Sequence, residues 1–165
     1  MTGTAENPTF RVGGRLLLID ADDRVLLIHE TYEDAGSGRT HWLTPGGGVE
    51  DEEDPRQTAV REAFEETGIE VSLAADAPEV LTTRRYWSWR DLHFDQVDHF
   101  FAARVPSGLA VQPQGLTDVE VLTLLGHRWW SVAELRETTE TILPPQLAEI
   151  LERVLADGAA GVLPA

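Results

Sequence analysis

Three glutamates lie within five residues of this sequence, at Glu62, Glu65 and Glu66. On a helix, residues three and four apart are neighbours, so these carboxylates would repel one another on an ordinary surface. Divalent cations held between the carboxylates would remove that repulsion, and hard cations such as Mg²⁺ prefer oxygen ligands. The spacing therefore predicts a site for divalent cations.

A short helix is expected to carry these glutamates. Asp54 suits its N-cap and Pro55 its first helical position, while Gln57 completes a capping-box pattern. Gly68 suits the left-handed residue that ends a helix. At about 100° per residue, one broad arc holds the residues that would pack on a core, namely Ala59, Val60, Ala63, Phe64 and Thr67. The three glutamates occupy the neighbouring arc.

A run of three glycines, Gly46 to Gly48, precedes this helix and follows a short expected strand at 41–44. Because glycine has no Cβ atom, the backbone can approach a ligand closely there and offer main-chain groups to it. Alone this run is a weak signal, because glycines are common in turns of every kind.

The composition is typical of a folded globular protein. Of the 165 residues, 42% are hydrophobic and 25% are charged. We expect a single domain over residues 1–165, with a core at about 10–155 and loose ends at 1–8 and 158–165.

The charge balance restricts the partners. The formal net charge is −16, from 13 basic and 29 acidic residues, so neither a nucleic acid polymer nor an anionic membrane is an expected partner. A small anionic substrate would need bound cations to mediate. The chain has no cysteine, which excludes thiolate sites. It has no apolar run long enough to span a bilayer and no secretory core, so we expect a cytoplasmic protein.

Strands are expected on both sides of the helix. Residues 10–19 and 24–29 are interpreted as a hairpin, with a bend or bulge at Gly13 and Gly14. The later expected elements are strands at 69–73, 80–89, 97–105 and 127–130, a hairpin connection at 91–95, and helices at 132–136 and 144–156. This order lacks the regular alternation of a doubly wound sheet, so it favours a mixed β-sheet with helices on its faces.

The turn after the first strand contains Asp20, Asp22 and Asp23 and is superficially similar to a calcium loop. A calcium loop has glycine at its sixth position and glutamate at its twelfth, where this chain has Val25 and Thr31. A solvated hairpin turn is therefore the favoured interpretation.

Gly47, Glu53 and residues 61–69 together resemble the complete Nudix box. That box reads Gly-x5-Glu-x7-Arg-Glu-U-x-Glu-Glu-x-Gly-U, where U is bulky or aliphatic, and every fixed position is present. Ala63 is small for its U position, and Glu52 stands where many members carry glycine. The resemblance implies an α+β fold, with an α/β/α sandwich around a mixed sheet. It also implies hydrolysis, dependent on Mg²⁺ or Mn²⁺, of a nucleoside diphosphate linked to another group X.

The resemblance also implies roles for the residues of the box. Glu65 and Glu66 are the implied metal ligands, and Glu62 is either a ligand or the base for the attacking water. The carbonyl oxygen of Gly47 is a further implied ligand.

Two more residues of the box have implied supporting roles. Arg61 lies four residues before Glu65, close enough on a helix to pair with its carboxylate. Glu53 is expected to contact Arg61 and to tie the preceding loop to the helix.

In many family members the base or another ligand is a glutamate outside the box. Glu120 is the first candidate here and Asp118 the second, because both precede Arg128, Trp129 and Trp130 in an expected loop near the site.

Substrate contacts are expected outside the box. Tyr86 lies 17 residues beyond Ile69, near where members acting on dinucleoside polyphosphates carry a tyrosine; a core or rim position is the alternative. Arg84 and Arg85 are candidates for contact with phosphate, or else exposed arginines that offset the acidic excess. Substrate choice is expected to depend on the segments 31–40, 84–95 and 112–120.

The expected partner is a small nucleotide diphosphate derivative. Relatives that cleave ADP-ribose tend to carry a proline where Arg84 stands, so nucleoside triphosphates and dinucleoside polyphosphates are favoured. The alternatives are a Nudix-fold sensor that binds a nucleotide without cleaving it, although sensors usually have an eroded box, and an acidic metal-buffering protein. The sequence leaves open whether two copies form a homodimer.

Overall fold

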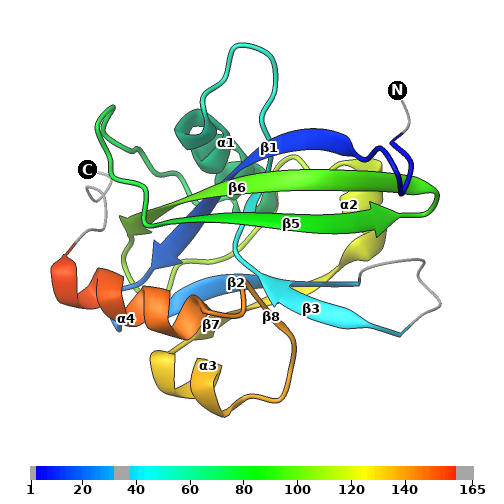
Figure 1. The fold of residues 1–165 in the computed structure, drawn as a ribbon. Coiled ribbons are helices and arrows are strands. Elements are labelled where there is room, and N and C mark those ends of the chain that lie inside the picture. Colours follow the sequence, from blue (N-terminus) through cyan, green and yellow to red (C-terminus); the bar gives the residue numbers. More distant parts are fainter. Residues whose placement is uncertain (1–2, 32–37, 159–165) are drawn as a thin grey trace.

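The computed structural model describes residues 3–31 and 38–158 (Figure 1). Part of the loop expected at 31–40, and most of the expected loose end at 158–165, lie outside these residues. Within them, no helix is long and apolar enough to cross a membrane. The first described residue, Gly3, is bound to the rest of the fold, because its carbonyl oxygen accepts a hydrogen bond from the backbone N–H of His93.

The described strands form one mixed sheet with the order β5-β6-β1-β2-β3-β8, while β4 pairs with β1 and β7 pairs with β2. The strands are β1 (Thr9–Ile19), β2 (Val25–Thr31), β3 (Thr40–Leu43), β4 (Gly46–Gly48), β5 (Leu81–Trp89), β6 (Leu92–Arg104), β7 (Leu124–Trp130) and β8 (Ile142–Leu143). The helices are α1 (Pro55–Thr67), α2 (Asp118–Thr123), α3 (Val132–Glu137) and α4 (Leu147–Asp157). The α+β fold with a mixed sheet is confirmed.

The two edges of β1 have different partners. One edge runs parallel to β6 from Thr9, opposite Phe94, to Ile19, opposite Arg104. The other edge pairs with β4, and its described ladder to β2 consists of the pair Ile19 and Val25. The hairpin predicted at 10–19 and 24–29 is therefore wrong beyond its turn. Beyond that pair β2 runs along β3 and β7 instead, so β1 and β2 diverge on either side of β4.

Helices cover both faces of the sheet. Successive side chains of a strand point to opposite faces, and Leu16 and Leu18 of β1 pack with Ala59 of α1. Leu17 and Ile19 pack on the other side, in a cluster that also contains Leu147, Ile150, Leu151 and Val154 of α4. In Figure 1, α1 lies above the strands, and α3 and α4 lie below them. β1 thus forms the shared wall of two cores.

Gly13 and Gly14 do not make the predicted bulge. The register between β1 and β6 runs through them without a shift. A Cβ atom on Gly14 would overlap the carbonyl oxygen of Pro55, and one on Gly13 would overlap the carboxylate of Asp98. The glycines are needed because α1 and a buried side chain lie directly on the strand.

Other boundaries differ from the predicted ones. Residues 69–73 are not a strand; Ile69 is buried against the core under α1, and Val71 and Leu73 pack on it from a loop. β6 begins at Leu92, so the connection predicted at 91–95 is a tight turn through Arg90, whose φ is 51°. The final helix begins at Leu147 rather than at 144, and β8 was not predicted.

We expect Gly14→Ala to lower the free energy of unfolding by at least about 2 kcal/mol, because the added methyl group must displace the first turn of α1. Gly126→Ala is the matched control, since a Cβ atom there meets open space, and it should change stability by less than about 0.5 kcal/mol. Urea denaturation measures both. Equal stabilities of the two variants would contradict the close packing of α1 on β1.

Candidate metal centre

The helix that carries the three glutamates begins and ends as its sequence predicts. The Asp54 side chain accepts hydrogen bonds from the backbone N–H groups of Arg56 and Gln57, and Gln57 Oε1 accepts from the backbone N–H of Asp54 at 2.8 Å. Gly68 has a φ of 72° and donates its N–H to the carbonyl oxygen of Phe64. The caps fix the first and last turns of α1, and so fix the glutamates relative to the loop before it.

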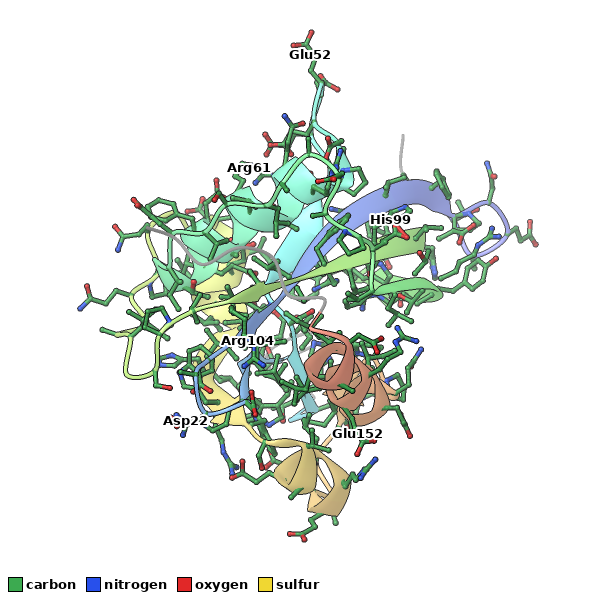
Figure 2. The ribbon with its side chains drawn as sticks, turned by 90° about the vertical axis from the view of Figure 1, so that its left-hand side faces the viewer. Asp22, Glu52, Arg61, His99, Arg104 and Glu152 are labelled. Carbon is green, nitrogen blue, oxygen red and sulfur yellow. The ribbon has the colours of Figure 1, made fainter. Side chains whose placement is uncertain are left out.

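Arg61 connects the loop to the helix (Figure 2). Its Nε and Nη2 donate to the two oxygens of Glu53 at 2.8 and 3.1 Å. Its Nη1 donates to Glu62 at 2.9 Å and to Glu65 at 3.1 Å, and Nη2 also donates to the carbonyl oxygen of Gly48. The predicted contact between Glu53 and Arg61 is therefore present. One guanidinium binds three carboxylates and the glycine strand.

Glu53 has further partners that hold its carboxylate in the charged form. It accepts hydrogen bonds from the Thr58 hydroxyl at 2.7 Å and from the backbone N–H of Glu50. The hydrogen bond from Arg61, together with these, lowers the pKa of Glu53 to about 2. Since unfolding would separate these groups, the charged form of Glu53 stabilises the native loop.

The backbone conformation of Glu52 shows why many family members carry glycine at this position. Glu52 has a φ of 68°, a left-handed conformation that glycine adopts at little cost. Figure 2 shows Glu52 at the tip of the turn before α1, pointing away from the protein. The turn therefore has the shape for which glycine is preferred, although a glutamate occupies it.

The glycine strand β4 contacts the carboxylates through its backbone. The N–H of Gly46 donates to Glu66 Oε2 at 2.8 Å. A Cβ atom on Gly47 would overlap the carboxylate of Glu62, so a side chain there would displace that carboxylate from its position beside the strand. Burial raises the pKa of Glu62, and it raises the pKa of Glu66 well above its ordinary value. A cation would favour the charged form of both carboxylates, because opposite charge offsets desolvation.

Glu120 joins this cluster from a separate segment. It lies on α2, so the loop predicted for it is wrong: Thr117 caps a short helix, and the Glu120 carboxylate accepts from the Thr117 backbone N–H at 2.7 Å. One oxygen each from Glu62, Glu66 and Glu120 lies within 4.8 Å of the others. These are oxygen ligands of the kind that Mg²⁺ and Mn²⁺ take, so the residues fit a divalent cation.

The remaining predicted ligands are placed differently. The Glu65 carboxylate is bound by Arg61, and within the described chain it is not part of the group formed by Glu62, Glu66 and Glu120. Asp118 is exposed at the start of α2. Gly47 adjoins Glu62, but its carbonyl oxygen as a ligand stays a prediction.

The predicted substrate residues on β5 lie on both faces of that strand. Arg85 points inward and forms an ion pair of 3.3 Å with the buried Asp98. Tyr86 is the next residue along the strand, so its side chain points to the opposite face, where it is 69% exposed. The Arg84 guanidinium lies 5.7 Å from the centre of its ring. Arg84 also binds Asp95 through two hydrogen bonds. The structure does not bring Tyr86 to the carboxylate cluster.

The ion pair between Arg15 and Asp98 was not predicted from the sequence. Arg15 of β1 lies 3.2 Å from Asp98 of β6, and both side chains are less than 10% exposed. A charged residue inside an apolar strand pattern was the available signal, since Arg15 directly precedes the apolar residues of β1.

We expect Glu53→Gln to lower the free energy of unfolding by about 1–3 kcal/mol at pH 7, because a charged partner of Arg61 is lost. The folded pKa of Glu53 is depressed, so its stabilisation is complete above about pH 4.5 and disappears as the pH falls toward 2. Urea denaturation at pH 7, 5.5 and 3 should thus show the variant and wild type converging at the lowest pH.

Glu50→Gln is the control, because Glu50 is 70% exposed and lies 3.8 Å from Arg61. It should change stability by less than about 0.5 kcal/mol at every pH. A deficit of Glu53→Gln that stays constant from pH 7 to 3 would contradict the charge-based account.

Comparison with known proteins agrees with this geometry. The family model described as the NUDIX domain matches residues 9–155. The chain is 43% identical over 63 residues to an RNA pyrophosphohydrolase of Roseobacter denitrificans, which covers 38% of this chain and 37% of that protein. It is 44% identical over 55 residues to the diphosphoinositol polyphosphate phosphohydrolase 3-beta of Bos taurus, covering 33% and 30%. The match thus spans about a third of the length of these curated relatives.

A solved structure shares the whole fold. The C. elegans Ap4A hydrolase binary complex superposes with a TM-score of 0.60 at 17% identity, covering 90% of this chain and 98% of that one. At this identity the likeness concerns the fold alone. The family match covers most of the chain and includes the glycine strand, α1 and α2, so the chain belongs to the Nudix family.

Proposed function

We propose that the protein is a hydrolase of phosphoanhydride bonds that cleaves the diphosphate linkage of a nucleotide derivative with the help of Mg²⁺ or Mn²⁺. The observation that carries the proposal is the group of Glu62, Glu66 and Glu120, whose oxygens converge from two separate helices. Three carboxylates this close repel one another when all are charged, in a protein whose net charge is already −16, and a bound cation would offset that repulsion. The names of similar proteins, pyrophosphohydrolases among them, support the same reaction class.

The roles of the residues follow from their positions. A divalent cation would neutralise charge on the diphosphate oxygens and lower the pKa of a bound water. Glu66 and Glu120 would hold the cation, with Glu66 kept in place by the Gly46 N–H. Glu62 would act as a further ligand or accept a proton from the attacking water, and Arg61 orients its carboxylate. Glu65 would serve as a ligand for an additional cation if it exchanges its bond to Arg61.

The substrate class is a nucleoside triphosphate or a dinucleoside polyphosphate. The name of one similar structure, an Ap4A hydrolase, supports the second. An RNA with a 5′-triphosphate is a specific alternative, because a similar curated protein is an RNA pyrophosphohydrolase. The excess of acidic residues disfavours a long RNA, since a polymer backbone adds repulsion that a single nucleotide does not.

We expect hydrolysis in the presence of Mg²⁺ when a panel is supplied that contains GTP, ATP, Ap4A and an RNA with a 5′-triphosphate. Glu66→Gln should lower kcat/KM on the preferred substrate at least about 100-fold while the thermal unfolding temperature stays within a few degrees, because it removes a ligand oxygen. Product release quantified by chromatography measures the rates.

Glu70→Gln is the matched control, since Glu70 is exposed directly after the box and should keep full activity. Activity that persists in excess chelator would contradict the proposal. Specific binding of a nucleotide without any turnover across the panel would instead favour the sensor alternative.

A further inference from the structure

A cavity of about 330 Å³ lies on the face of the sheet opposite α1. Its wall consists of residues from β1, β3, β5 and β6 and of the turn from β8 to α4. This volume is at the lower end of the range for small-molecule sites. The cavity adjoins the metal centre through β4, because Arg15, which lines the cavity, lies against Gly46, whose N–H binds Glu66.

The floor of the cavity is a fixed charged network. Asp98 is 1% exposed and lies 3.2 Å from Arg15 Nε and 3.3 Å from Arg85 Nε, both measured to Oδ2. Its Oδ1 accepts from Gln96 Nε2 at 2.6 Å. Arg15 also donates to the carbonyl oxygen of Thr44 at 3.1 Å. Asp98 thus uses one oxygen to hold two guanidinium groups and the other to bind Gln96.

Hydrogen-bond donors are in excess at this wall. A guanidinium has five N–H donors and no acceptor. Among the described residues, the terminal nitrogens of Arg85 have no hydrogen-bond partner, and the Arg85 side chain is 31% exposed and lines the cavity. Its guanidinium carbon also lies 5.7 Å from the Trp87 ring centre. A ligand group that presents acceptors would therefore be bound here, and a group that presents a donor would face an N–H.

The charges near this wall balance one another. Arg15 and Arg85 carry two positive charges, Asp98 carries one negative charge, and Glu30 acts electrostatically on both arginines. Arg84 also lines the cavity, and its charge is paired with Asp95. Glu66 adds negative potential at Arg15. Without a net positive charge, the donors suit a neutral group with acceptors better than a second phosphate.

Part of the remaining wall is apolar, while Thr83, Arg84 and Gln146 contribute polar groups. Leu43, Phe100, Leu143 and Pro144 line the cavity, and Leu43 and Phe100 are less than 10% exposed. Apolar side chains beside a polar edge suit a heterocyclic base, which buries its faces and hydrogen-bonds through its rim. A purine base has that form.

We propose that this cavity binds the base of the nucleotide substrate and selects a 6-oxopurine over a 6-aminopurine, with Arg85 and Arg15 as the specificity-determining residues and Asp98 as their positioning residue. Guanine and hypoxanthine present two adjacent acceptors, O6 and N7, which a guanidinium fork matches bidentately. Adenine presents an amino group in place of O6, which would face a donor, and uracil lacks N7. The inference rests on the proposed function in one respect, namely that the substrate phosphates bind beside Glu66.

Binding of monophosphates without metal tests the selection separately from catalysis. We expect GMP and IMP to bind wild-type protein at least about 10-fold more tightly than AMP, as measured by NMR titration in the presence of a chelator. The three ligands carry the same phosphate, so a difference reports the base edge. Equal dissociation constants, or no measurable binding of any of the three, would overturn the inference.

Two variants assign the preference to Arg85. Arg85→Gln should bring the dissociation constants of GMP and AMP to within about threefold of each other, and Arg85→Lys should do the same while keeping a charge beside Asp98. Arg136→Gln is the matched control, because Arg136 is half-exposed on α3 and pairs with Glu152, and it should keep the wild-type preference. An unchanged preference in a folded Arg85→Lys protein would overturn the assignment.

The outcomes also separate this inference from the hydrolase proposal. A base preference without hydrolysis would support the cavity and contradict the reaction, whereas hydrolysis without a base preference would do the reverse. Competition of GMP by inorganic phosphate at the Arg85 resonances would mean that the arginines bind an anion, and would also overturn the inference.

Discussion

Repulsion among carboxylates is the constraint on which the arrangement of this site depends. Arg61 partly relieves it, because one guanidinium binds Glu53, Glu62 and Glu65. It does not bind Glu66, where burial raises the pKa well above its ordinary value although the Gly46 N–H favours the charged form. The guanidinium of Arg61 thus organises the loop and the helix, while Glu66 and Glu120 form no hydrogen bond with an arginine of the described chain and would be neutralised by the proposed cation.

The divergence of β1 and β2 places the metal centre and the cavity next to each other. β4 fills the gap between these strands, and its glycines allow close approach on both sides. Glu62 and Glu66 lie against this backbone from α1, while Arg15 lies against it from β1. A side chain on Gly47 would displace the Glu62 carboxylate, so glycine at this position keeps the carboxylate against β4. A nucleotide bound across β4 would reach the cations with its phosphates and the cavity with its base.

Local sequence signals predicted the local parts of this structure. The capping box, Gly68 and the fixed spacing from Gly47 to Ile69 correctly predicted α1 and the contact between Glu53 and Arg61. Pairings between distant segments were not predictable in this way. The separation of β1 from β2 depends on their partners in β6 and β7, and the ion pair of Arg15 with Asp98 joins strands far apart in the sequence. Glu120 was placed near the site by resemblance, whereas its helix came from a capping box at Thr117 that was overlooked.

Direct measurement of Mn²⁺ binding tests most directly whether the metal centre is built from two helices. Electron paramagnetic resonance of free Mn²⁺ gives the dissociation constant without substrate, for wild type, Glu120→Gln and the control Asp118→Asn. Because Glu120 contributes an oxygen within 4.8 Å of Glu62 and Glu66, its loss should weaken Mn²⁺ binding at least about 10-fold. Asp118 is exposed on the same helix, so its variant should bind like wild type. Unchanged Mn²⁺ affinity in Glu120→Gln would contradict the assignment of Glu120 to the metal centre.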